Sequence, residues 1–108
     1  MTRATLHVTQ SDIDASRDRR TQSTLDRQSP AYNPERDCPI GVALARTFAI
    51  KREMIRAHPD YLRIGDYESG DAPHNASLYE STAVIRAFMR AWDRYGNAEP
   101  KTFALRRI

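Results

Sequence analysis

A wide apolar stripe runs along residues 81–95 and constrains the fold more than any other feature of the sequence. Apolar side chains recur there at three- and four-residue spacing, which places them on one side of an α-helix. They are Val84, Ile85, Phe88, Met89, Trp92 and Tyr95. Ser81 or Thr82 can cap the start of this helix, and Gly96-Asn97 favours the left-handed turn that ends one. Because the stripe must be buried, the sequence predicts a folded domain with this helix docked on its core.

Alternating patterns predict short strands on both sides of this helix. Pro100 blocks further helix, and in residues 101–105 the side chains of Phe103 and Leu105 face one way, as in a half-buried strand. Similar alternation or short apolar runs predict further strands over residues 4–9, 61–67 and 77–80, with a turn-rich connector over residues 68–76.

Asp37-Cys38-Pro39 predicts the start of a second long helix, because proline is tolerated in the first helical turn. Its apolar positions begin at Ile40 and return at helical spacing. The pattern can continue to Ala57, where His58-Pro59 stops it, or break near Ala49.

The segment between the predicted strand over residues 4–9 and the helix start at Asp37 is very polar. A short helix is expected after Thr9 or Ser11, with Ile13 as its one strong apolar anchor. Ordering a backbone costs about 1–2 kcal/mol per residue, and residues 15–37 hold too few apolar side chains to offset this cost. We therefore expect residues 15–37 to form a flexible polar loop.

These patterns predict a single α+β domain over residues 1–108. We expect a small antiparallel or mixed sheet of three or four strands, with two longer helices packed on one face and the polar loop beside them. The sequence contains no run of about 18 apolar residues, the length that a membrane-crossing helix needs, and no apolar leader follows Met1. We therefore expect a cytoplasmic protein without a membrane partner.

Positive charge is concentrated at the C-terminal end of the chain. Residues 1–80 hold 11 basic and 12 acidic side chains, whereas residues 81–108 hold six basic and two acidic ones. On a helix, residues four apart lie nearly in line, so Arg86, Arg90 and Arg94 form one row opposite the apolar stripe. Such a row can hold phosphates or an acidic protein surface, and it can also be an ordinary solvated face.

The residues that usually carry catalysis or bind metals form no recognisable motif. Cys38 can be a nucleophile at a helix start or a small buried side chain, and no histidine is near it in the sequence. His7, His58 and His74 are dispersed without metal-ligand spacing. The sequence therefore predicts no catalytic residue, metal site or cofactor.

Three stretches of the chain carry a family resemblance. They are Leu6-His7-Val8-Thr9 followed by Ser11-Asp12-Ile13, the helix start Asp37-Cys38-Pro39-Ile40-Gly41-Val42-Ala43-Leu44-Ala45-Arg46, and Val84-Ile85-Arg86-Ala87-Phe88 followed by Glu99-Pro100-Lys101-Thr102-Phe103-Ala104-Leu105. The set resembles an uncharacterised family of small phage and prophage proteins with a Cys-Pro-Ile/Val helix start and a closing Glu-Pro-x-Thr-Phe-x-Leu strand. The resemblance implies a phage origin and a fold, and it carries over no catalytic residue.

By analogy with small phage proteins that inhibit host enzymes or CRISPR complexes, we expect a non-enzymatic accessory protein. It would bind and block a host or defence protein or nucleoprotein complex in the host cytoplasm. The alternatives are a small nucleic-acid-binding protein that uses the same basic face and a cysteine-dependent enzyme. The expected partner-binding residues are Arg86, Arg90, Arg94, Lys101, Arg106 and Arg107.

Overall fold

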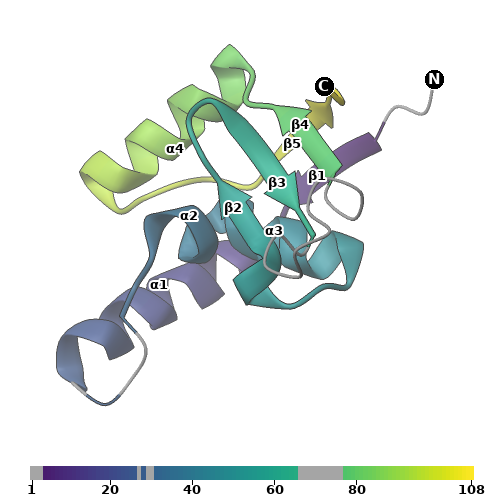
Figure 1. Cartoon of the computed structure of the whole chain (residues 1–108). Helices are drawn as coiled ribbons and strands as arrows, with labels where there is room; N and C mark the ends of the chain where they lie inside the picture. The colour runs from purple at the N-terminus through teal and green to yellow at the C-terminus, as the bar shows by residue number, and fades with distance from the viewer. Residues whose placement is uncertain (1–3, 27, 29–30, 66–76) are drawn as a thin grey trace.

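A first strand leads into a run of helices, then a run of short strands, and finally one helix and one strand in a computed structural model that describes residues 4–26, 28, 31–65 and 77–108 (Figure 1). In chain order the described elements are β1 (Ala4–Val8), α1 (Gln10–Leu25), α2 (Pro34–Asp37), α3 (Pro39–Phe48), the 3-10 turn η1 (Arg52–Met54), β2 (Ile55–Ala57), β3 (Tyr61–Ile64), β4 (Ser77–Glu80), α4 (Ala83–Tyr95) and β5 (Lys101–Leu105). The predicted α+β class is confirmed.

The strands form two antiparallel sheets instead of the single sheet that we expected. β1 pairs with β5, so that Leu6 lies opposite Phe103. β2, β3 and β4 form the second sheet in that order, with Leu62 opposite Ala57 on one side and Tyr79 on the other. Buried side chains alternate along these strands, which gives each sheet one face in the core.

The last residues of the chain join the two sheets. After β5 has paired with β1, the backbone N–H of Glu80 donates to the carbonyl of Arg106 at 2.7 Å, and that of Ile108 donates to the carbonyl of Leu78 at 3.0 Å. Arg107 forms an isolated antiparallel bridge with Tyr79. The chain end therefore covers the edge of β4 that β3 leaves open.

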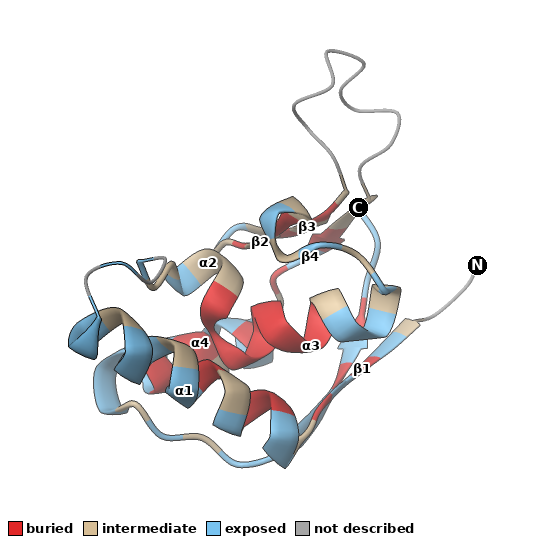
Figure 2. Ribbon diagram, turned by 90° about the horizontal axis from the view of Figure 1, so that it is seen from below, coloured by how far each residue is buried: buried red, intermediate tan, exposed pale blue. Residues whose placement is uncertain are grey.

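Helix α3 lies at the centre of the molecule, and its N-terminal half is buried (Figure 2). It contacts α1, α2, β1 and β2. The helix ends at Phe48 because Ala49 adopts the left-handed conformation, with φ 52°. The expected break near Ala49 is thus confirmed, whereas a helix continuing to Ala57 is wrong. Ile55, which fits the helical stripe, lies in strand β2 instead, where its side chain and that of Ala57 are buried on one face.

The strands over residues 4–8 and 77–80 and the C-terminal strand and helix are close to their predicted bounds. The expected extension of β3 to Tyr67 and the connector over residues 68–76 lie outside the described residues.

The prediction of an unstructured loop over residues 15–37 is wrong for residues 15–25 and 34–37. Helix α1 has 16 residues and begins with a capping box, in which the Thr9 hydroxyl accepts from the Asp12 N–H and the Asp12 carboxylate accepts from the Thr9 N–H. The residues buried along α1 are Asp12, Ile13 and Ser16. Polar contacts therefore hold a helix that apolar burial alone would not predict.

A buried carboxylate supplies most of these contacts. Asp37 is 0% exposed and accepts hydrogen bonds from Arg19 of α1 at 3.0 Å, from Arg52 of η1, and from the backbone N–H of Asn33 at 2.8 Å. The hydroxyl of Ser16 also donates to the carbonyl of Asp37. Two arginines and one backbone N–H thus compensate the cost of burying the Asp37 carboxylate, and their contacts join α1, α2 and η1.

Replacing Asp37 with alanine should lower the free energy of unfolding by about 3–5 kcal/mol, because the two arginines that it pairs with lose a buried counter-charge. The measurement is urea unfolding of the whole chain. Asp14→Ala is the matched control, since the Asp14 side chain is 58% exposed and its contacts, an ion pair with Arg17 at 3.6 Å and a hydrogen bond from Gln10 at 3.0 Å, lie at the surface. A loss below about 1 kcal/mol for Asp37→Ala would show that the cluster does not hold α1.

A second buried carboxylate joins α1 to α3. Asp12 accepts from Nε of Arg46 at 3.0 Å and from its Nη2 at 2.9 Å, and Nη2 also donates to the carbonyl of His7 at 2.7 Å. Burial acts to raise the pKa of Asp12, but the hydrogen bonds from Arg46 and Thr9 outweigh it, and the pKa lies below its ordinary value.

As the pH falls, the Asp12 carboxylate is protonated at a higher pH in the unfolded chain than in the folded one. Asp12 therefore contributes its full stabilisation only above its ordinary pKa of 3.8. That stability is lost as the pH falls from 3.8 through the lowered folded pKa. The difference in stability between the natural chain and Arg46→Gln, measured by urea unfolding at about pH 6, should therefore shrink as the pH falls below 3.8. A difference that stays constant over this range would show that the pair contributes no such linkage.

Candidate functional site

Helix α4 is docked through a narrower apolar stripe than the sequence predicts. The Thr82 hydroxyl accepts from the N–H of Ile85, and Gly96 ends the helix in the left-handed conformation, with φ 64°. Ile85, Met89 and Trp92 are buried. Val84 and Tyr95 lie at the edge of the stripe and are 50% and 70% exposed.

Two aromatic contacts fix the buried face of α4. The ring of Phe88 meets that of Phe103 edge-on, with centroids 5.3 Å apart. Nε1 of Trp92 donates to the hydroxyl of Tyr32 at 2.8 Å, so the indole nitrogen finds a partner in the segment before α2. The rotation of the helix about its axis is thereby set, and its opposite face points to solvent.

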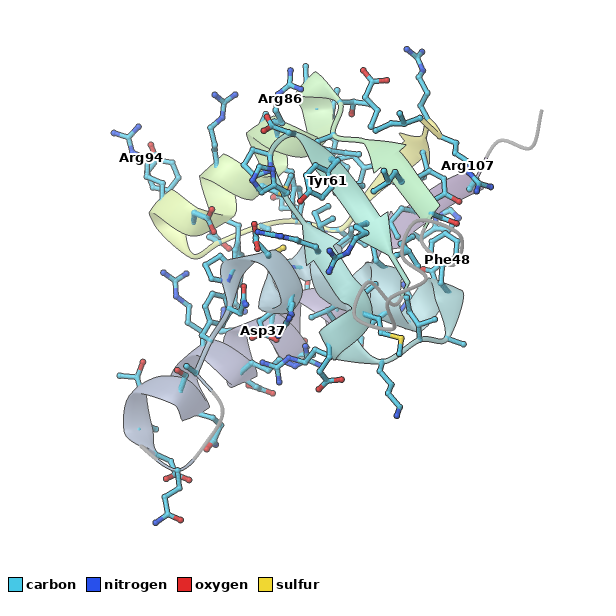
Figure 3. The ribbon with its side chains drawn as sticks, in the orientation of Figure 1. Asp37, Phe48, Tyr61, Arg86, Arg94 and Arg107 are labelled. Atoms are coloured by element: carbon cyan, nitrogen blue, oxygen red, sulfur yellow. The ribbon has the colours of Figure 1, made fainter. Side chains whose placement is uncertain are left out.

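The three arginines of that opposite face are exposed, as the sequence predicts. Arg86 and Arg94 project from opposite ends of α4 (Figure 3). Arg86 also donates to the carbonyl of Ser81, and the guanidinium of Arg94 lies 5.5 Å from the ring centroid of Tyr95. Arg90 forms no hydrogen bond or ion pair with any residue in the described ranges. The row therefore remains able to bind an anion.

The other three predicted binding residues lie on β5 and the chain end instead of α4. Lys101 is on β5, with its Nζ 5.8 Å from the ring centroid of Phe103. Arg106 pairs with Glu80 at 3.8 Å. Arg107 follows it on the chain end, across the molecule from Arg94 (Figure 3). The structure thus places three of the predicted residues on α4 and three on β5 and the chain end, where Arg106 contacts Glu80, the residue before the Ser81 carbonyl that accepts from Arg86.

A pocket of about 320 Å³ opens beside the row. It is bounded by α4 on one side and by α2 and the β2–β3 turn on the other. Its lining residues are Pro34, Glu35, Cys38, Ala57, Pro59, Arg86, Met89, Arg90 and Asp93. Two arginines of the predicted row therefore belong to the wall of a pocket with an apolar interior.

The carboxylates of this pocket come from segments far apart in the sequence. Glu35 accepts from Nε of Arg56 at 2.9 Å and lies 4.0 Å from Nε2 of His58. Asp93 is on α4, and its pKa is raised by burial, an effect that the charge of Arg20 partly offsets. No sequence spacing links Glu35 with Asp93, so sequence analysis could not identify this pair.

Cys38 lies at the base of the pocket and is buried, which was one of the two interpretations of the sequence. Its side chain is 2% exposed, and its sulfur accepts from the N–H of Gly41 at 3.4 Å. Burial raises the pKa of the Cys38 thiol to about 12. The thiol is therefore protonated at neutral pH.

Iodoacetamide should alkylate Cys38 slowly in the folded chain and rapidly after denaturation, because the thiolate is the reacting form and burial suppresses it. Mass spectrometry of timed samples at neutral pH measures both rates. Rapid alkylation of the folded protein would instead favour the cysteine-dependent enzyme.

No three His, Cys, Asp or Glu side chains converge on a possible metal site within the described part of the chain. His58 stacks on Tyr61 with centroids 4.9 Å apart, and Nδ1 of His7 is 3.0 Å from the Thr102 hydroxyl. His74 lies outside the described residues.

None of the described helices has both the length and the apolar character needed to cross a bilayer. Comparisons with protein-family models, curated proteins and solved structures give no match to this chain. The resemblance to a phage protein family stays a prediction from the sequence.

Proposed function

We propose that this chain is a non-enzymatic binding protein that holds an acidic segment of a partner protein on the exposed face of α4. In keeping with the sequence resemblance, the partner would be a host or defence protein or nucleoprotein complex in the host cytoplasm, which binding would block. The observation that carries the proposal is the exposed row of Arg86, Arg90 and Arg94 on a helix docked by its other face.

The geometry of α4 supports a binding role for this row. Ile85 and Trp92 are 0% exposed, so the helix is fixed before any partner arrives, and the arginines need no rearrangement of the backbone to meet one. Arginine presents a planar group of donors that matches a carboxylate. The adjoining apolar pocket gives the surface a place for a partner's side chain in addition to its charge.

Nucleic acid is the alternative occupant of the same row. The carboxylate of Asp93 lies on the same helix, and Glu35 lines the other wall of the pocket, so both would approach a phosphate backbone on that side of the row. A partner with separate carboxylates and apolar side chains fits this mixed surface better than a continuous chain of phosphates.

Poly-L-glutamate, a simple acidic polypeptide, should bind the whole chain at low salt, and the double substitution Arg90→Glu with Arg94→Glu should weaken that binding by about tenfold or more, because attraction becomes repulsion. Lys101→Glu with Arg107→Glu is the matched control. It makes the same change in net charge on β5 and the chain end, and it should reduce binding by less than about threefold.

Fluorescence anisotropy of labelled poly-L-glutamate and of a labelled single-stranded oligonucleotide measures both affinities under one salt condition. Tighter binding of the oligonucleotide, lost in the α4 variant, would assign the row to nucleic acid and overturn the proposal. Equal losses in the two variants would show that only net charge matters and that α4 is not the site.

A further inference from the structure

The pocket beside α4 is apolar inside and charged at its mouth. The inner surface is formed by the buried residues Cys38, Ala57 and Met89. Pro34 and Pro59 line the wall that faces α4. Its volume of about 320 Å³ is at the lower end of the range for ligand sites. Such a pocket suits one large side chain better than an extended molecule.

The charges around the mouth favour an anionic neighbour. Arg86 and Arg90 stand one helical turn apart on the α4 wall, and the negative charge of Glu35 on the other wall is already paired with Arg56 at 2.9 Å. Asp93 is the remaining carboxylate, and it forms no hydrogen bond or ion pair with the rest of the described chain. It is thus available to accept a hydrogen bond from a group inside the pocket.

These features define the occupant by its chemistry. We propose that the pocket receives one tyrosine side chain of the acidic partner segment, while Arg86 and Arg90 pair with carboxylates next to it. The ring would lie against Met89 and Ala57, and its hydroxyl would donate to Asp93. This inference rests on the proposed function, since it names the part of the acidic partner that enters the molecule.

An anchored side chain changes what the arginine row can do. Exposed ion pairs are weak and are screened by salt, so a row of arginines alone distinguishes poorly between acidic partners. An aromatic side chain buried in a neighbouring pocket adds affinity that salt does not screen and sets the position of the segment on α4. The pocket would therefore provide the specificity, and the row would provide the attraction.

The probes are three capped peptides, Glu-Glu-Tyr-Glu-Glu, Glu-Glu-Phe-Glu-Glu and Glu-Glu-Ala-Glu-Glu, titrated into the full chain. All three should bind, with the tyrosine peptide about tenfold tighter than the alanine peptide because its ring is buried. The phenylalanine peptide should fall between them, because it leaves Asp93 without a donor.

Methyl NMR of the chain labelled at methionine locates the ring. The Met89 methyl should shift with the tyrosine peptide and much less with the alanine peptide, because an aromatic ring next to it changes its local magnetic field. Met54, in η1 and outside the pocket, should not move in either titration. A tyrosine peptide that binds without shifting Met89 would overturn the inference.

Two substitutions of alanine by methionine provide the matched test. Ala57→Met fills the pocket and should abolish the advantage of the tyrosine peptide, whereas Ala87→Met, at an exposed position of α4 outside the pocket, should preserve it. Thermal unfolding establishes that both variants are folded. If Ala57→Met does not fold, Asp93→Ala serves instead, because it removes the acceptor of the tyrosine hydroxyl and should abolish the advantage of the tyrosine peptide over the phenylalanine peptide.

The outcomes separate the two proposals. If none of the peptides binds at low salt, the proposed function fails. If the tyrosine and alanine peptides bind equally, or the advantage of tyrosine survives in folded Ala57→Met, the acidic-segment function stands and the pocket assignment is wrong. If the phenylalanine peptide binds as tightly as the tyrosine peptide, Asp93 does not receive a hydroxyl and the assignment of tyrosine is wrong.

Discussion

The buried carboxylate of Asp37 holds together the part of the molecule that has the least apolar surface. It is placed at the end of α2, and its partners come from α1, η1 and the start of α2. Removing such a group from water is costly unless every oxygen is paired, and here both oxygens are. The cluster does for α1 and α2 what an apolar core does for the strands and for α4.

The same cluster positions one wall of the candidate site. The corner between α2 and α3 is tight, because any side chain at Gly41 would collide with the backbone carbonyl of Arg36. Asp37 anchors this corner next to Cys38 at the pocket base and two residues after Glu35. Helix α4 supplies the opposite wall. The pocket therefore exists because a polar cluster and an apolar helix stripe fix two segments independently and leave a gap between them.

The fold follows from the sequence where one residue or one local pattern decides the structure. Thr82 and Gly96 mark the ends of α4, the break at Ala49 ends α3, and alternation identifies β5. The outward direction of the arginine row follows from the same helical periodicity. Local signals were sufficient for these elements because each depends on neighbours within a few residues.

The rest depended on contacts between distant residues. The start of α1 at Thr9 was predicted, but its continuation through residues 15–25 was missed, because Arg19 and Ser16 meet Asp37 across about twenty positions and no pattern in the sequence reports that meeting. Strand β2 was not predicted, because Ile55 alone continues the helical stripe of the preceding segment and a strand of three residues is too short to show alternation. The pocket was missed because its walls come from segments far apart in the sequence, within residues 34–38, 57–59 and 86–93.

Amide hydrogen exchange along α1 tests most directly the claim that buried polar contacts order this region. We expect the amides of residues 14–20 to exchange much more slowly than an unfolded chain under native conditions, and to lose that protection when Asp37 is replaced by asparagine. Exchange of these amides at the rate of an unfolded chain in the natural protein would contradict the account, because residues 15–25 would then be the flexible loop that their composition suggests.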